Sequence, residues 1–180
     1  MTLAVHRLTY ALAAAGCAAA LTGPTASAAP QGTDDEPSPC WSDQLAVSAS
    51  PTQGAVGHRA LTLTFALAGG AAPCTLTGYP GVDSGAGGPL IHARPTLRGY
   101  MGGLPAALSA PPTVTLSLSQ QAQAIVEGMA IDGSGNRCPS YTELLVNAPN
   151  TIDVFTVPVA IDACQLQVHP ITAPQPESAQ

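Results

Sequence analysis

The stretch LTLTFAL, residues 61–67, decides the fold, because every second residue in it is large and apolar. Alternation with a period of two is typical of a β-strand that turns one face to the core and the other to solvent. Gly69 and Gly70 follow closely, and both tolerate the positive φ angles that a turn needs. The stretch therefore predicts a half-buried strand that ends in a turn.

The same alternation recurs in short runs along the chain, and Gly and Pro residues separate the runs. No long stretch has the periodicity of an amphipathic helix. The runs predict strands at residues 45–49, 61–67, 74–76, 90–93, 114–118, 122–129, 144–146, 152–157 and 164–168. Such a series predicts an all-β fold, an antiparallel two-sheet sandwich of about eight strands. A small barrel is the alternative.

Residues 1–28 have the three parts of a secretory signal peptide. Arg7 provides the positive start, residues 8–21 are uncharged and rich in Ala and Leu, and residues 26–28 fit the small-x-small cleavage pattern. The apolar run is too short to span a membrane, and no later run reaches the length that would. We therefore expect a secreted chain that has no transmembrane segment after cleavage.

Cys17 gives this prediction an alternative. Residues 14–17 read AAGC and resemble a degraded lipoprotein-processing site, at which the cysteine would carry the lipid. Lipoproteins usually have Leu three residues before that cysteine, where this chain has Ala14, and apolar sequence continues here as far as Leu21. The flanking residues favour plain secretion, and membrane anchoring through Cys17 remains the alternative.

Two polar segments flank the predicted domain. Residues 29–39 are acidic and contain proline, so they predict a disordered linker. Residues 171–180 predict a disordered tail. The sandwich domain is then residues 40–170, a length that suits a single hydrophobic core.

The charge of the chain limits its partners. Five Lys and Arg residues stand against eleven Asp and Glu residues, and the formal net charge is -6. All five cations are Arg and they form no cluster, so the attraction to phosphate that dominates nucleic-acid binding is missing. We expect a monomer that binds a protein or a cell-wall ligand and no nucleic acid.

Four cysteines follow the predicted leader, and their even number in an exported chain predicts a disulfide framework. None lies in a C-x-x-C pair, which disfavours a zinc ribbon and a thioredoxin-like site. Three pairings are possible. We expect Cys40 with Cys74 and Cys138 with Cys164, because each pair brackets a candidate strand and its return.

The other candidate ligands show no convincing spacing. His58, His92 and His169 lie on separate segments, so they predict scattered surface histidines and no metal site. Residues 132–143 match a calcium loop through Asp132 and Glu143 at its ends. However, Arg137 stands where that loop needs Gly, so the segment predicts a Gly-rich turn.

Motifs of catalysis are missing as well, namely a nucleophile elbow, a carboxylate pair and a phosphate-binding glycine loop. We expect no catalytic residue and no cofactor, and a protein that is not an enzyme. A secreted hydrolase or enzyme inhibitor that acts through the long loop at residues 99–112 is the alternative. The single tryptophan, Trp41, follows Cys40, and we expect it to pack against the disulfide rather than stack on a sugar.

Residues 73–82 read PCTLTGYPGV, with an apolar strand before them and two cysteines far downstream. This combination resembles the actinobacterial family known as domain of unknown function 4232, over residues 40–170. The resemblance implies an immunoglobulin-like sandwich at the cell envelope or outside the cell, and it carries over no functional residue. By itself the segment predicts a corner, because Gly78 and Gly81 allow unusual φ angles and Pro80 fixes a turn.

Overall fold

The computed structural model describes residues 36–174, so the predicted signal peptide, Cys17 and most of the predicted linker lie outside the described residues. The described chain consists of strands and one short 3-10 helix, and eight of its strands have four residues or more, as predicted. The elements are η1 (Ser42–Gln44), β1 (Leu45–Ala49), β2 (Gln53–Ala55), β3 (His58–Leu67), β4 (Cys74–Thr77), β5 (Gly81–Ser84), β6 (Arg94–Pro95), β7 (Thr113–Leu116), β8 (Ala122–Met129), β9 (Ser140–Asn147), β10 (Phe155–Asp162) and β11 (Leu166–Val168).

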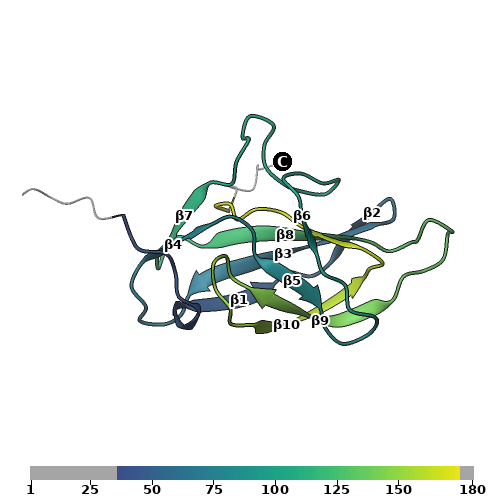
Figure 1. Cartoon of the computed structure of the whole chain (residues 1–180), viewed down its shortest axis with the longest axis horizontal. Helices are drawn as coiled ribbons and strands as arrows, with labels where there is room; N and C mark the ends of the chain where they lie inside the picture. The colour runs from purple at the N-terminus through teal and green to yellow at the C-terminus, as the bar shows by residue number, and fades with distance from the viewer. Residues whose placement is uncertain (1–35, 175–180) are drawn as a thin grey trace, which may run out of the picture. The chain divides into compact units, whose positions relative to one another are not determined.

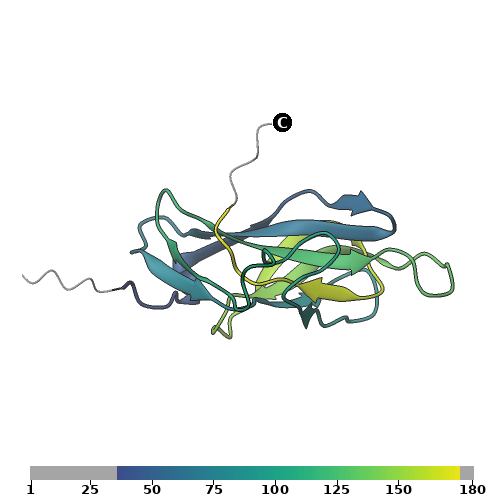
Figure 2. The ribbon, with the colours of Figure 1, turned by 90° about the horizontal axis from the view of Figure 1, so that it is seen from above.

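Two sheets form the body of the domain. The larger sheet has the order β1-β3-β8-β11-β6, and β2 pairs with residues 58–60 of β3, which β1 does not reach. The smaller sheet has the order β10-β9-β5. Figure 1 shows β5 and β9 below β3 and β8, which pass in front of them in Figure 2. All pairs are antiparallel except β11 with β6, and a separate antiparallel pair joins β4 to β7. The predicted antiparallel sandwich is thus confirmed.

The strand order is that of an immunoglobulin-like sandwich, in which strands A, B, E and D form one sheet and C, F and G the other. Taken in chain order, β1-β3-β8 corresponds to A-B-E and β10-β9-β5 to G-F-C. The place beside E, which a D strand would fill, is taken by β11, the last strand of the chain. The predicted immunoglobulin-like order is present, with its D position filled from the C-terminal end.

The stretch at residues 61–67 lies in the central strand β3, which pairs with β1 on one side and β8 on the other. Leu61, Leu63 and Phe65 are at most 2% exposed, and they share one core with Leu144 and Val146 of β9. The intervening residues of β3 are only half-buried. The alternation therefore assigned the core face correctly.

Both predicted disulfides are present. Cys40–Cys74 joins the start of the domain to β4, and Cys138–Cys164 joins the segment before β9 to the segment before β11. Two disulfides in a domain of this size are typical of an oxidising compartment. Within residues 36–174, no helix is long and apolar enough to cross a membrane.

One predicted strand is wrong, and three observed strands, β2, β5 and β6, were missed. Residues 90–93 form no regular strand, although Ile91 and Ala93 exchange backbone hydrogen bonds with the neighbouring β5. The regular strand beside them is β5, which the sequence indicated only as the end of a turn. With four residues and the sequence GVDS, β5 is too short and polar for its alternation to stand out.

The ends of the domain reach further than predicted. Residues 37–39, assigned to the linker, lie beside β4, where Ser38 O accepts a hydrogen bond from Thr75 N at 2.9 Å. Ile171, assigned to the tail, is fully buried, and its N–H donates to Gly78 O at 2.8 Å. Backbone groups at both ends are thus hydrogen-bonded to the domain. The amino-acid composition of these segments does not predict such bonds.

Phe65→Ala tests the assigned core. The ring is fully enclosed, so we expect its removal to lower the free energy of unfolding by about 3–5 kcal/mol, measured by urea denaturation. Thr64→Ala, on the opposite face of the same strand, is the control and should change it by less than about 1 kcal/mol. Equal losses in the two variants would contradict the assignment.

Candidate functional site

Glu127 is the one carboxylate that the described fold buries, with 3% of its surface exposed. It lies on β8, where Ala122, Ala124 and Val126 face the core. Side chains alternate along a strand, so Glu127 projects from the outer face of the larger sheet. The start of the loop at residues 99–112 covers it there.

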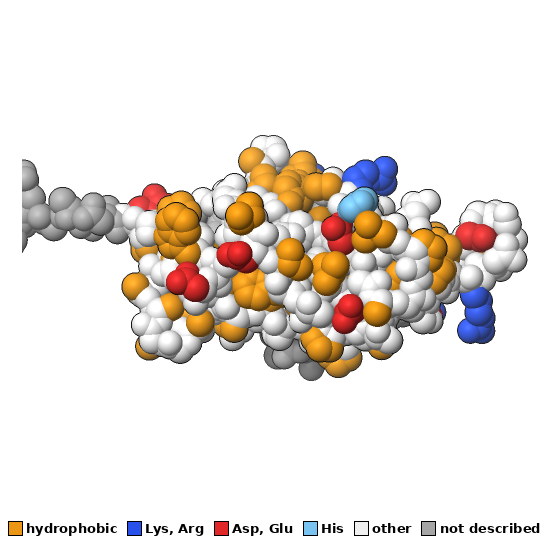
Figure 3. Space-filling view, turned by 60° about the horizontal axis from the view of Figure 1, so that its bottom comes forward, with side chains coloured by type: hydrophobic (Ala, Val, Ile, Leu, Met, Phe, Trp, Pro, Cys, Tyr) orange, Lys and Arg blue, Asp and Glu red, His pale blue; other side chains and the backbone are white. Residues whose placement is uncertain are grey.

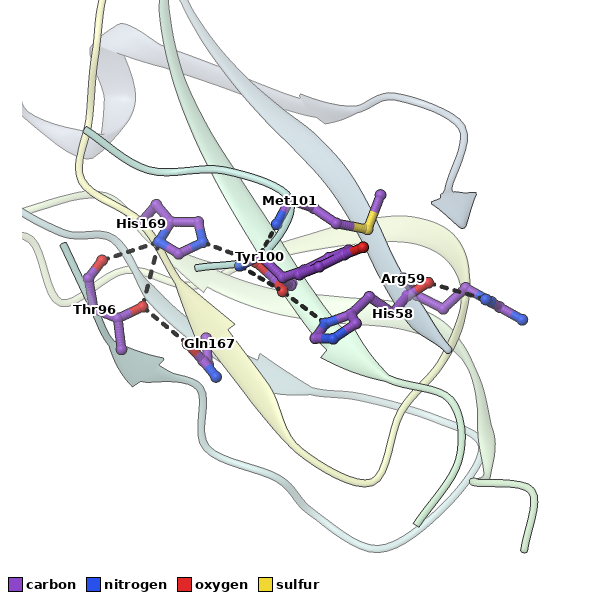
Figure 4. Close-up of polar contacts among 8 residues, drawn as sticks. His58, Arg59, Thr96, Tyr100, Met101, Gln167 and His169 are labelled. Carbon is purple, nitrogen blue, oxygen red and sulfur yellow. Dashed lines mark hydrogen bonds and ion pairs between the residues drawn. The ribbon is translucent and has the colours of Figure 1, made fainter. Parts of the chain in front are cut away.

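Four donors surround this carboxylate (Figure 4). Its Oε1 accepts hydrogen bonds from His58 Nδ1 at 2.8 Å and from the Tyr100 backbone N–H at 3.1 Å. Its Oε2 accepts from the Met101 backbone N–H at 3.0 Å and from His169 Nε2 at 3.3 Å. The carboxylate is fully hydrogen-bonded, as a buried charge must be to avoid a large desolvation cost.

His169 is 1% exposed and faces acceptors with both ring nitrogens. Its Nδ1 lies 3.0 Å from Thr96 O, and the Thr96 hydroxyl donates to Gln167 Oε1 at 3.2 Å. Nδ1 also lies 3.3 Å from the Thr96 hydroxyl. A carboxylate can only accept, so Nε2 carries the proton that is donated to Glu127. Glu127 and His169 thereby form a buried, charge-assisted pair.

The pKa of Glu127 follows from two opposing causes. Burial by itself raises the pKa, because it disfavours the charged carboxylate. The hydrogen bonds from Met101 N, His169, Tyr100 N and His58 together outweigh burial and hold the pKa below its usual range. Glu127 is therefore ionised at neutral pH.

Close approach of the loop to the sheet depends on small residues. A Cβ at Gly99 would collide with Glu127 Oε2 and the ring of His169. Further along the loop, Leu104 is 4% exposed, and the loop residue Tyr100 stacks its ring on His58 with centroids 4.3 Å apart. The cluster around Glu127 is thus an anchor that fixes the loop to the sheet.

A second anchor holds the far part of this loop. The Arg98 guanidinium donates hydrogen bonds to the carbonyl oxygens of Pro105, Ala106 and Leu108. Residues 105–108 form a single turn, closed by Leu108 N and Pro105 O at 3.0 Å. The loop predicted as a long surface segment is therefore tied down at two points.

The prediction of scattered surface histidines is wrong for two of the three. His169 is buried, His58 has a side chain only 24% exposed, and both reach the same carboxylate. His92 does lie at the surface, where it pairs with Asp83 at 2.7 Å. Spacing in the sequence gave no sign of the cluster, but a lone Glu within the apolar run of β8 was an available signal.

Asp132 and Glu143, the two ends of the calcium-loop pattern, bind different partners in the structure. Asp132 accepts hydrogen bonds from Ser134 N and Asn136 N at 2.8 Å each, so its carboxylate closes its own turn. The hydrogen bonds from Asn136 and Ser134 lower the pKa of Asp132. Glu143 instead accepts from Ala86 N at 3.3 Å. Within the described residues, no group of three or more His, Cys, Asp and Glu side chains is arranged to hold a metal ion.

Trp41 does not pack against the disulfide as predicted; it is 73% exposed. The side chain of Cys40 points inward at 6% exposure, so its neighbour Trp41 is turned outward. Trp41 N donates to Gln44 Oε1 at 2.8 Å, and Gln44 N donates to Trp41 O at 3.1 Å. These bonds with the turn η1 hold the backbone of Trp41 in place.

A hollow of about 520 Å³ opens beside Trp41. We call it the Trp41 groove and define it by the residues that line it, 38–42 and 150–153. Its second wall carries Ile152, which is 91% exposed. Asn147 Nδ2 donates to the carbonyl oxygens of Ile152 at 3.1 Å and Asp153 at 2.8 Å, so this wall is also fixed. The groove thus combines exposed apolar side chains with a backbone that is fixed on both lining segments.

A family comparison covers most of the described domain. The family model described as Domain of unknown function (DUF4232) matches residues 40–172. The protein belongs to this family. No curated protein and no solved structure matches the chain.

In this DUF4232 domain the segment at residues 73–82 builds a corner, as predicted. β4 occupies its first half, and Gly78 follows with a φ of 103°, a conformation that favours glycine. The carbonyl of Gly78 receives the bond from Ile171, so the corner also secures the end of the chain. The segment therefore has a structural role at this corner of the fold.

Glu127→Gln tests the anchor. We expect the variant to lose about 3 kcal/mol of unfolding free energy at pH 7, because His169 loses its charged partner in a buried site. A lowered pKa stabilises the fold above the usual pKa of Glu, and this contribution disappears as the pH falls through the lowered value. The difference between wild type and variant should therefore shrink below about pH 4.

The measurement is urea unfolding of both proteins at pH 7 and pH 3, with Glu36→Gln at an exposed position as the control. A difference that stays the same or grows on acidification would contradict the assigned role of Glu127.

Proposed function

We propose that this domain is a non-enzymatic binding module that works outside the cytoplasm, secreted or held at the cell envelope, and that its ligand surface is the Trp41 groove. One observation carries the proposal: Trp41 and Ile152 line the same hollow and are 73% and 91% exposed. The two disulfides support the compartment.

Exposed apolar side chains of this size favour an interface. Tryptophan is highly buried on average, and it is enriched among the residues that contribute most to binding. In the Trp41 groove an indole and a branched aliphatic side chain line one hollow. A ligand that binds there would bury both side chains, and the removal of their apolar surface from water would favour binding.

Rigidity supports the same function. Cys40 is held by its disulfide and by its N–H bond to Thr75 O at 3.0 Å, and Asn147 fixes the wall that carries Ile152. A preformed site loses little conformational entropy when its ligand binds. The groove therefore suits binding without rearrangement.

The alternative, a hydrolase or inhibitor that acts through the loop at residues 99–112, finds one supporting observation. His58 and Glu127 form a hydrogen-bonded pair beside that loop, as a general base and its orienting carboxylate do. Among the described residues, however, no Ser, Thr or Cys side chain hydrogen-bonds to His58. The pair also holds the loop in place through Tyr100, which favours a structural role.

Binding to the outside of cells tests the proposal. We expect the labelled domain to bind intact cells or cell-wall preparations of its source organism saturably. Trp41→Ala and Ile152→Ser should each weaken binding at least about tenfold, as expected for central interface residues. Leu118→Ser is the matched control, since Leu118 is 92% exposed outside the groove.

Two outcomes would contradict the proposal. Binding that Trp41→Ala leaves unchanged would remove the groove as the ligand surface. Binding that is lost in Tyr100→Ala instead, or hydrolytic activity abolished by His58→Ala, would favour the loop at residues 99–112.

A further inference from the structure

The charged side chains that line the Trp41 groove and the hollow beside it are all acidic. Asp153 lines the groove, and it also lines an adjoining hollow of about 500 Å³ together with Trp41 and Asp43. Among the described residues, neither carboxylate forms an ion pair, and no Arg lines either hollow. Toward the left of Figure 3, acidic side chains lie beside hydrophobic ones, and the Arg side chains in view lie toward the right.

An indole between two carboxylates is an attractive place for a cation. The face of an aromatic ring carries partial negative charge and attracts ammonium and guanidinium groups. Two unpaired carboxylates in the same hollow add to the negative potential and raise the local concentration of cations. The same arrangement repels phosphates and carboxylates, which excludes an anionic ligand.

We propose that the Trp41 groove binds a basic segment of a partner protein. A Lys or Arg side chain of that segment lies against Trp41 between Asp43 and Asp153, and a neighbouring apolar side chain packs on Ile152. This rests on the proposed function and adds the chemistry of the partner. A volume of about 520 Å³ lies within the usual range of ligand sites.

The apolar wall favours a peptide segment over a small cation. Pro39 and Ile152 line the groove, whereas Asp43 lines only the adjoining hollow, so a ligand that fills both needs an apolar group next to its charge. A basic residue with an apolar neighbour meets that requirement. A free inorganic cation would leave the apolar wall in water.

Within residues 36–174, no basic side chain lines the groove. The sequence at residues 34–36 reads DDE and contains no cation. A second copy of the domain could offer only arginines, because the chain contains no lysine. Of these, Arg94, Arg98 and Arg137 lie at exposed positions, so self-association through one of them is an outcome that the test must recognise.

The test uses short peptides and the intact domain. The probes are the capped tripeptides Leu-Arg-Leu, Leu-citrulline-Leu and Leu-Glu-Leu, and the readout is the fluorescence of Trp41, the only tryptophan of the chain. We expect saturable binding of Leu-Arg-Leu, at least about fivefold tighter than the uncharged citrulline peptide, and weaker in higher salt. Equal binding of the Arg and citrulline peptides would overturn the proposal.

Variants locate the cation by calorimetry. Asp43→Asn and Asp153→Asn should each weaken Leu-Arg-Leu about threefold or more, and Trp41→Ala should abolish measurable binding. Asp132→Asn, which removes the same charge at a distant turn, is the control and should leave binding unchanged. A control variant that weakens binding as much as Asp43→Asn would show a general charge effect and overturn the proposed site.

The outcomes separate this inference from the proposed function. If no peptide binds while binding to cells still depends on Trp41, the groove is a ligand surface for another chemistry and only this inference fails. Tight binding of a neutral oligosaccharide, or self-association lost in Arg94→Gln, Arg98→Gln or Arg137→Gln, would likewise overturn the basic segment as occupant. If binding to cells is independent of Trp41 as well, both proposals fail.

Discussion

The Cys40–Cys74 disulfide is the constraint on which the proposed binding end of the domain depends. It ties the first described segment to β4, and the bonds of Ser38 and Cys40 with Thr75 extend the same contact. With Cys40 held inward, Trp41 is turned to solvent at the first residue before η1. A covalent constraint thus holds the backbone beside an indole that stands at the surface.

On the outer face of the larger sheet, the buried carboxylate of Glu127 likewise fixes a segment of the chain, the loop at residues 99–112. A charge-assisted pair such as Glu127 with His169 adds little net stability, because desolvation offsets the attraction, but breaking it is costly. The pair therefore specifies one position for the loop at residues 99–112 more than it stabilises the fold. The two features have separate roles: the Glu127 cluster holds a loop, and the Trp41 groove is the ligand surface that we propose.

The sequence predicted what depends on local pattern and missed what depends on contacts across the fold. Alternation in residues 61–67 identified the core strand, and the order of the cysteines suggested the correct disulfides. The cluster of His58 and His169 on Glu127 could not be predicted, since it joins β3, β8 and the segment after β11. The sequence predicted that Trp41 packs against the disulfide, whereas it is exposed beside the buried Cys40.

The accessibility of Trp41 to water tests the central claim most directly, because it is the only tryptophan of the chain. Acrylamide quenching of the intrinsic fluorescence of the oxidised domain is the measurement. The account predicts quenching close to that of free tryptophan, together with the emission of a water-exposed indole, and protection when a ligand occupies the groove. Weak quenching and the emission of a buried indole in the free domain would contradict it.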